Sequence, residues 1–528
     1  MALHARLLPR IAFACGLGIT ALLGACGGGG GDSNGNAIPI SIAGTVASPA
    51  RGTALTPVPE RVIRLSVDEF KTLLGANSTG RVLLQASGTP KCGIDVRYLQ
   101  YQTVGGQGES TTASAAIMVP SGTNAACNGP RPIVLYAHGT ATERNYNIAD
   151  LNNTNQPAGA EGVVVAAMFA AQGYIVVAPN YAGYDASTLP YHPFLNANQQ
   201  GKDMVDALTA ARSTLTAISA LDSGALFLTG YSQGGYVALA AQREMQNTNI
   251  RVTASAPLSA PSAISLLLDY SASGLPELGG TVFLPLITAS WQKQFGNVYS
   301  STKEIYEDKY ASGIDTLLPS FTPSDELLSS GKLPRYALFP ADAVPGPRDA
   351  SVQINYGADN LVRQSYLTTW FNDIKSSPCP GNALPQTTGS VTTTSPLDCA
   401  PAIGLRKAAL ANDLRNWLPT RPTLMCGGAN DPTVNYASTL ATAGYFRARG
   451  MPNTALTVID VEQSGLNDIY ATARAGFAQA KAQERANTAG TEADKDLSVQ
   501  LAYHGQLVPA WCLQSARIFF DSVAAAGG

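Results

Sequence analysis

Residues 226–235 read LFLTGYSQGG, and the fold can be inferred outward from this stretch. An apolar run typical of a buried strand ends at Gly230, and a helical pattern, GGYVALAAQ, begins at Gly234. The chain must therefore turn sharply from strand to helix at Ser232, the context in which a G-x-S-x-G motif exposes its serine as a nucleophile. The two glycines fit such a turn, because it leaves no room for a Cβ on either side. The alternative interpretation is a helix N-cap serine in a glycine-rich turn.

Short apolar runs recur along the chain, and each ends in a polar or glycine-rich loop. Between several of them lie helical patterns, such as NQQGKDMVDALTAARSTL at residues 198–215. Runs that are apolar throughout and alternate with helices predict an α/β fold, with a mostly parallel central sheet and helices on both faces. Residues 60–120 instead alternate between apolar and polar positions, which predicts antiparallel strands. The apolar runs are RPIVLYAHGT (131–140), GYIVVAPNYAGY (173–184), RPTLMCGGAND (421–431) and TALTVIDVEQS (454–464).

Two insertions interrupt this alternation. Helical patterns occur at 301–313 and 406–418, and we expect residues 262–415 to form a mainly helical cap. The second insertion, residues 467–500, predicts one or two polar helices. The expected core consists of residues 56–261 and 416–528.

A serine hydroxyl is a poor nucleophile without a general base, which is most often a histidine. In the chain order that accompanies this strand–turn–helix motif, the acid and then the histidine follow the serine. The chain has four histidines, and only His504, in LAYHGQLVPAWC, lies downstream of Ser232. His504 is therefore the expected base, and the alternative is a surface histidine in a loop. His192 is expected either at the edge of the entrance to the site or in a loop without function.

The acid of such a site should follow a strand that lies between Ser232 and His504 in the sequence. Asp431 follows an apolar run and a pair of glycines, so its loop would project it toward the histidine. Asp431 also precedes a proline, as a helix N-cap does when proline takes the first helical position. The two roles are compatible. Asp460 and Glu462, near the end of the next expected strand, are the alternatives.

Acyl transfer at Ser232 would need two backbone N–H donors for the oxyanion. The N–H of Gln233, directly after the serine, is one of them, and the other should come from the loop after an early strand. The loop AHGTATER supplies it: Gly139 permits close approach, and we expect the N–H of Thr140 to be the donor, with its hydroxyl as a third. His138 is expected to support this loop by hydrogen bonding rather than to act as the base.

Cysteine usage points to export. Without the two cysteines of the N-terminal segment, six remain and allow 15 pairings, and an even number in an exported chain indicates disulfides. A structural zinc site is the competing use, but no C-x2-C spacing occurs. Sequence proximity favours Cys92 with Cys127 and Cys379 with Cys399, which leaves Cys426 with Cys512. The pair Cys426–Cys512 would tie the strand before Asp431 to the segment after His504.

The N-terminal residues 1–25 have the pattern of a signal peptide. Two arginines precede a 15-residue, mostly apolar run that is too short to span a bilayer comfortably. The end of this run, LGAC, resembles a bacterial lipobox, in which Cys26 is lipidated and becomes the mature N-terminus; the alternative is an ordinary secretory signal. Because Gly27 follows the cysteine, the resemblance implies retention in the outer membrane of a Gram-negative source. Residues 26–55 predict a flexible tether.

The composition argues against a nucleic-acid partner. Charged residues make up only 13% of the chain, the formal net charge is -3, and no block of like charges occurs, whereas binding to phosphates needs clustered lysine and arginine. The sequence also contains no Walker-type loop, no H-E-x-x-H and no dinucleotide fingerprint, so we expect neither a metal nor an organic cofactor. After residue 25 no apolar run is long enough for a membrane span, which leaves the N-terminal lipid as the expected membrane attachment.

Together, the motifs AHGT, APNYAGY, GYSQGG, GGANDPTV and YHGQLVPAWC resemble the α/β-hydrolase superfamily across most of residues 80–528. They are most similar to bacterial relatives of the secretory lipase family, whose members carry a helical cap over the site and hydrolyse carboxylic esters. The insertion before His504 is long, and the fungal lipases of that family do not use an HGT loop of this kind. The resemblance therefore implies ester hydrolysis more firmly than true lipase activity.

The resemblance implies a substrate that is a small-molecule, lipid or polyester ester. Residues 280–299 would either line an acyl pocket or serve as ordinary packing between cap and core. A peptidase or amidase with the same three side chains is one alternative function. A surface binding lipoprotein on an inactive hydrolase scaffold is another.

Overall fold

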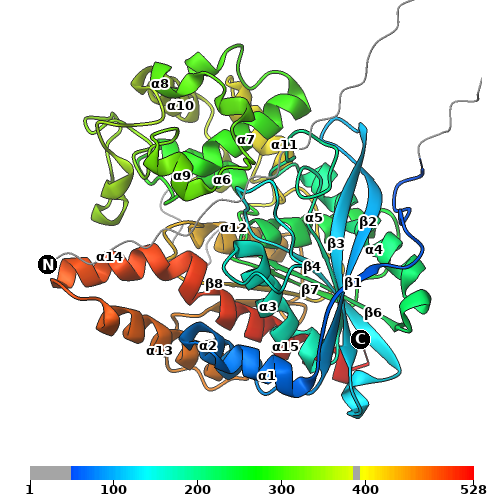
Figure 1. Ribbon diagram of the computed structural model, residues 1–528. Coiled ribbons are helices and arrows are strands. Elements are labelled where there is room, and N and C mark those ends of the chain that lie inside the picture. The colour runs from blue at the N-terminus through cyan, green and yellow to red at the C-terminus, as the bar shows by residue number, and fades with distance from the viewer. Residues whose placement is uncertain (1–48, 384–392, 528) are drawn as a thin grey trace, which may run out of the picture. The chain divides into compact units, whose positions relative to one another are not determined.

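The computed structural model describes residues 49–383 and 393–527, where nine strands form a single sheet (Figure 1). The expected signal peptide, Cys26 and most of the expected tether lie outside the described residues. The strand order is β1-β2-β3-β5-β4-β6-β7-β8-β9, antiparallel from β1 to β5 and parallel from β5 to β9. This mostly parallel sheet confirms the predicted fold class. The strands are β1 (Glu60–Leu65), β2 (Gly93–Val104), β3 (Ser110–Ser121), β4 (Pro130–Ala137), β5 (Ile175–Pro179), β6 (Leu221–Tyr231), β7 (Ala254–Leu258), β8 (Thr423–Gly427) and β9 (Leu456–Asp460).

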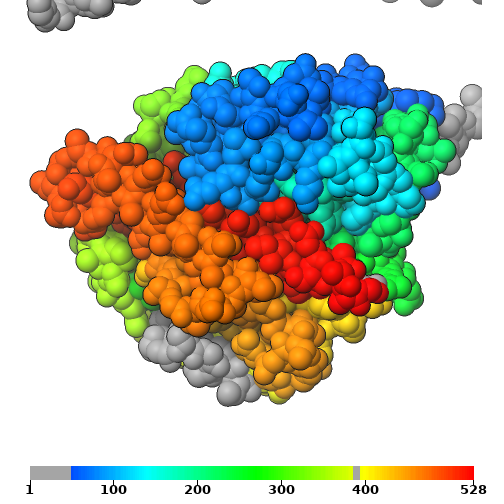
Figure 2. All heavy atoms as spheres, turned by 90° about the horizontal axis from the view of Figure 1, so that it is seen from below, coloured from blue at the N-terminus to red at the C-terminus, as the bar shows by residue number. Residues whose placement is uncertain are grey.

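Helices cover both faces of the sheet, and this explains why the central strands are mostly apolar. Every residue of β5, β7 and β8 is buried. Helices α4 and α5 pack together, with α5 against β4, β6 and β7, while α15 packs against α3 and against β6, β7 and β8. Figure 2 shows α15, in red, between the blue surface of α1 and α2 and the orange surface of α13.

The helices are distributed over the expected core, the expected cap and the second insertion. No helix within the described ranges is long and apolar enough to cross a membrane. The helices are α1 (Val67–Gly75), α2 (Ser78–Ser87), α3 (Pro157–Met168), α4 (Ala197–Thr214), α5 (Gln233–Asn247), α6 (Ile264–Ala272), α7 (Gly280–Phe295), α8 (Asp308–Ala311), α9 (Ser324–Ser329), α10 (Gln364–Ser376), α11 (Gly404–Asn412), α12 (Ala437–Ala448), α13 (Ala471–Asn487), α14 (Glu492–Ala502) and α15 (Pro509–Ala525).

The expectation of strands throughout residues 60–120 is wrong for the segment between β1 and β2, which forms α1 and α2. A capping box starts α1: the Ser66 side chain accepts from the N–H of Glu69, and the Glu69 carboxylate accepts from the N–H of Ser66. Phe70 and Leu74, four residues apart on one face of the helix, are buried. The sequence S-x-x-E was therefore the local signal for this helix.

Helices α6 to α11 lie between β7 and β8 in the sequence, within the region expected to form a cap (Figure 1). Two of the helices predicted from sequence patterns are shorter than the patterns indicated. Residues 301–313 form only a 3-10 turn and the single-turn helix α8. Residues 406–418 are helical only up to Asn412, because Asp413 adopts an extended conformation and pairs with Arg415 in a fully buried ion pair. The second insertion forms the two helices α13 and α14.

The three disulfides that sequence proximity favoured are confirmed. One of them links β8 to α15, so it joins the strand before Asp431 to the helix after His504. The bridges are Cys92–Cys127, Cys379–Cys399 and Cys426–Cys512.

Candidate active site

Ser232 lies at the turn from β6 into α5, in a backbone conformation that a residue with a side chain rarely adopts. Its φ is 60° and its ψ is -124°. A Cβ on Gly230 would lie 2.4 Å from the carbonyl oxygen of Ala137, and one on Gly234 would lie 2.0 Å from the same atom. Both flanking positions therefore require glycine. The strained turn holds the serine hydroxyl at the carboxyl end of the sheet.

The structure brings Ser232, His504 and Asp431 together. The Nε2 atom of His504 lies 2.8 Å from the Oγ of Ser232, and its Nδ1 lies 2.7 Å from Oδ2 of Asp431. With the proton on Nδ1, the imidazole donates to the carboxylate and accepts from the serine hydroxyl. This arrangement allows the imidazole to take the hydroxyl proton while the carboxylate stabilises the resulting charge. His504 lies in a π-helical turn between α14 and α15 (Tyr503–Leu507), not in a surface loop.

Asp431 uses its two carboxylate oxygens for different purposes. Oδ2 accepts from His504, while Oδ1 accepts from the N–H groups of Thr433 and Val434 at 2.9 and 3.0 Å. The expected helix N-cap is corrected to the cap of a turn, because α12 begins only at Ala437. The two backbone donors fix the carboxylate, whose side chain is 1% exposed, so that one oxygen faces the imidazole.

The alternative acids, Asp460 and Glu462, have other partners in the described structure. Oδ1 of Asp460 accepts from the N–H of Ala429 at 3.0 Å, so this carboxylate holds the loop that leads to Asp431. Burial raises the pKa of Asp460. Glu462 pairs with Lys481.

Two backbone N–H groups beside Ser232 lack an acceptor within the described ranges, those of Thr140 and Gln233. Both residues line the same cavity as the serine. The preceding N–H, that of Gly139, donates to Oε1 of Glu161 at 3.1 Å, which anchors the loop without using the donor at Thr140. Two unoccupied donors next to a nucleophile can stabilise an oxyanion.

His138 is buried beneath this loop. Its ring stacks between Tyr146 and Tyr181, at centroid distances of 4.1 and 4.0 Å. Nδ1 lies 2.6 Å from the carbonyl oxygen of Gly139, and Nε2 lies 3.2 Å from that of Asn180. Burial lowers the pKa of His138 and therefore favours the neutral ring.

His192 lies in a loop, as one of the two expectations had it, but it is buried behind the nucleophile and not at the edge of the entrance. Its Nδ1 donates to the carbonyl oxygen of Ala182 at 2.9 Å, so Nε2 is left to accept from the side-chain amide of Gln233 at 2.7 Å. Burial lowers the pKa of His192 to about 3, which keeps this acceptor available. His192 thus holds the residue that follows Ser232.

Tyr231 makes a second contact in the site that the sequence did not reveal. Its hydroxyl donates to the backbone carbonyl of His504 at 2.7 Å, across 273 positions of sequence. The glycine–serine motif leaves the identity of this residue open, so no local signal could have found the contact. Tyr231 fixes the backbone of His504 to the strand that carries Ser232.

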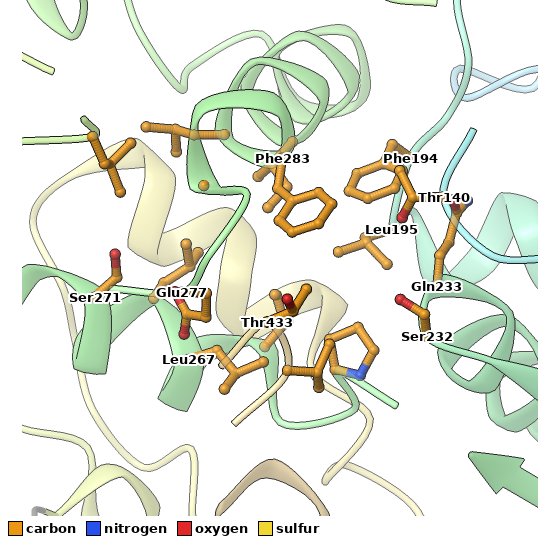
Figure 3. Close-up of a pocket in the computed structure, with 18 of the residues that line it drawn as sticks. Thr140, Phe194, Leu195, Ser232, Gln233, Leu267, Ser271, Glu277, Phe283 and Thr433 are labelled. Carbon is orange, nitrogen blue, oxygen red and sulfur yellow. The ribbon is translucent and has the colours of Figure 1, made fainter. Parts of the chain in front are cut away.

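An apolar cavity opens at Ser232 and extends along α6 and α7 (Figure 3). Thr140, Ser232 and Gln233 lie together at one end of it. Residues 280–299 contribute both to the cavity and to packing, because Phe283, Leu284 and Ile287 line the cavity, whereas Trp291 lies outside the lining and is fully buried. The apolar lining from α6 and α7 comprises Ile264, Leu267, Leu268, Phe283, Leu284 and Ile287.

Comparison with known proteins agrees with this fold. The prolyl oligopeptidase family matches residues 164–260, which include Ser232. The rice cell wall degrading esterase LipA from Xanthomonas oryzae has a similar structure, with a TM-score of 0.63 and 23% sequence identity to this chain. The match covers 90% of this chain and all of LipA. A mutant of the same esterase is 25% identical, with a TM-score of 0.60 and coverage of 81% and 95%.

A candidate hydrolase from Legionella pneumophila is 18% identical, with a TM-score of 0.61 and coverage of 89% and 98%. The chain matches no curated protein sequence. The structural matches show that the chain has the α/β-hydrolase fold.

Proposed function

We propose that this α/β-hydrolase is a serine hydrolase that cleaves carboxylic esters through an acyl-enzyme intermediate. One observation carries the proposal: the hydrogen-bonded series from Ser232 through His504 to Asp431 meets two free N–H groups at the end of an apolar cavity. A nucleophile, a base, an orienting acid and oxyanion donors are the parts that acyl transfer needs.

In the proposed reaction, His504 takes the proton of Ser232 while Oγ attacks the ester carbonyl carbon. The N–H groups of Thr140 and Gln233 stabilise the oxyanion of the tetrahedral intermediate. The intermediate collapses, the bond between the carbonyl carbon and the alcohol oxygen breaks, and the alcohol leaves with the proton from His504. Water then attacks the acyl-enzyme by the same steps and releases the acid. Asp431 remains ionised throughout and keeps the imidazole in the correct tautomer.

Two observations favour an ester as the substrate. The side chains of α6 and α7 give the cavity an apolar lining that suits an acyl chain. The esterase LipA of Xanthomonas oryzae has the same fold over most of both chains. Neither the reaction steps nor the residues named require a cofactor.

A peptidase or amidase with the same residues is the second candidate, and the match to the prolyl oligopeptidase family favours it. A p-nitrophenyl ester and a p-nitroanilide of one acyl group separate the two functions. We expect kcat/KM to be much higher for the ester. Equal values would support the amidase.

The inactive binding scaffold is tested with a fluorophosphonate, which reacts with an activated serine. We expect covalent labelling of the wild type and none of Ser232→Ala. Ser223→Ala removes an exposed hydroxyl near the start of β6 and is the matched control that should label normally. A folded wild type that resists labelling would contradict the proposal.

We further propose that the protein is exported and anchored through a lipid on Cys26. The LGAC sequence supports the anchor, and three disulfides support an oxidising compartment, because cytosolic thiols are kept reduced. Metabolic labelling with a palmitate analogue should mark the wild type and spare Cys26→Ser. Labelling that persists in this variant would contradict the anchor.

A further inference from the structure

Glu277 is an acidic side chain at the far end of the apolar cavity. It lies in the connection between α6 and α7, and Figure 3 shows it with Ser271 at the end of the cavity opposite Ser232. The proposed reaction does not use it.

The Oε1 atom of Glu277 is buried and has no hydrogen-bond partner within residues 49–383 and 393–527. Leaving such an acceptor unpaired is unfavourable, because it gives up its hydrogen bonds to water and gains none in return. The described lining contains no lysine, arginine or histidine that could neutralise a carboxylate. Burial raises the pKa of Glu277 to about 8, so the neutral carboxyl prevails at pH 7. A neutral carboxyl can both donate and accept a hydrogen bond.

Resting on the proposed ester hydrolysis, we propose that Glu277 binds a hydroxyl group at the distal end of the acyl chain, so that the preferred substrates are esters of hydroxylated fatty acids. The carbonyl carbon lies at Ser232, the methylene chain lies along the leucines and phenylalanine of α6 and α7, and the hydroxyl meets Oε1. This occupant gives a partner to Oε1 of Glu277, the unpaired buried acceptor at the end of the cavity far from Ser232.

Other distal groups fit this end of the cavity less well. A methyl group leaves Oε1 unpaired. An ammonium or a second carboxylate must lose its water in an apolar cavity, and the lining offers no cation to a carboxylate. A hydroxyl costs far less to desolvate and pairs with the neutral carboxyl in both directions.

The test compares p-nitrophenyl esters of equal chain length that end in a methyl, a hydroxyl, an ammonium or a carboxylate group, over a series of chain lengths. At the length that spans the cavity, we expect kcat/KM to be about tenfold higher for the hydroxyl ester than for the methyl ester. Equal values at every length, or a preference for either charged group, would overturn the inference. If the wild type cleaves none of these esters, the proposed function itself fails.

Variants at residue 277 test whether the preference for the hydroxyl ester depends on the Glu277 side chain. Glu277→Leu should reverse it in favour of the methyl ester, because the hydroxyl then loses its partner. Glu277→Gln keeps a donor and an acceptor and should retain the preference, which also guards against misfolding of the leucine variant. Glu326→Gln, the same change on the exposed side of α9, is the matched control and should leave the ratio as in the wild type. A wild-type ratio in Glu277→Leu would overturn the assignment.

Discussion

Replacing Asp431 with asparagine should put the proton of His504 on the wrong nitrogen. In the wild type, Oδ1 of Asp431 accepts from two backbone N–H groups and Oδ2 accepts from Nδ1 of His504. The amide oxygen of asparagine must keep the Oδ1 position, because an NH2 group there would leave both backbone donors unpaired. The amide nitrogen then faces Nδ1 of His504 and donates to it. The proton moves to Nε2, which can no longer accept from Ser232.

The loss expected for Asp431→Asn is about 10⁴-fold in kcat. At 1.36 kcal/mol for each factor of ten, this corresponds to about 5.5 kcal/mol of transition-state stabilisation. Substrate binding should change little, because Asp431 is buried behind the imidazole, with its side chain 1% exposed. The loss should therefore appear in kcat and leave KM nearly unchanged.

Initial rates on a p-nitrophenyl ester, with the folded enzyme quantified by circular dichroism, measure this effect. Asp460→Asn is the matched control: its carboxylate holds the neighbouring loop through Ala429 but does not contact the imidazole, so we expect a loss below about tenfold. Folded Asp431→Asn that keeps kcat within tenfold of the wild type would refute the tautomer argument. If Asp460→Asn loses as much activity as Asp431→Asn, the loss results from displacement of the loop and not from the position of the proton on His504.

Three further predictions concern stability. Gly234→Ala should prevent folding or lower the melting temperature strongly, because the added Cβ would lie 2.0 Å from the Ala137 carbonyl oxygen; a melting temperature like that of the wild type would contradict this geometry. The double change Cys426→Ser and Cys512→Ser opens a loop of 86 residues and should lower the free energy of unfolding by about 4.6 kcal/mol in urea titrations, whereas an unchanged midpoint would exclude the bridge. Burial raises the pKa of Glu277 to about 8, so the stability that its neutral form contributes is fully present below about pH 4.5 and is lost as the pH rises through 8. Relative to Glu277→Gln, the free energy of unfolding of the wild type should therefore fall by about 1.4 kcal/mol per pH unit between pH 5 and 8. Parallel curves of stability against pH for the two proteins would contradict a buried carboxyl.

Some features that the sequence missed had a local signal, and others had none. The capping box at Ser66 and Glu69 marks the start of α1, so this helix could have been found. The contact between His192 and Gln233 joins residues 41 positions apart, and nothing near either residue indicates it. The sequence likewise gives no sign that Oε1 of Glu277 is left without a hydrogen-bond partner, because this depends on the helices that surround it.

The amino-acid sequence alone is sufficient to predict the α/β architecture, the strand-to-helix turn at Ser232, His504 as the one histidine downstream of it and the favoured cysteine pairs. Each of these depends on neighbouring residues, on chain order or on parity, all of which can be read along one dimension. The choice between Asp431 and Asp460 as the partner of the imidazole follows from three-dimensional packing, because Asp431 lies just after β8 and Asp460 ends β9, its neighbour in the same sheet. That choice depends on a contact of 2.7 Å across 73 positions, which is fixed by the packing of β8 against its neighbours and not by any local pattern.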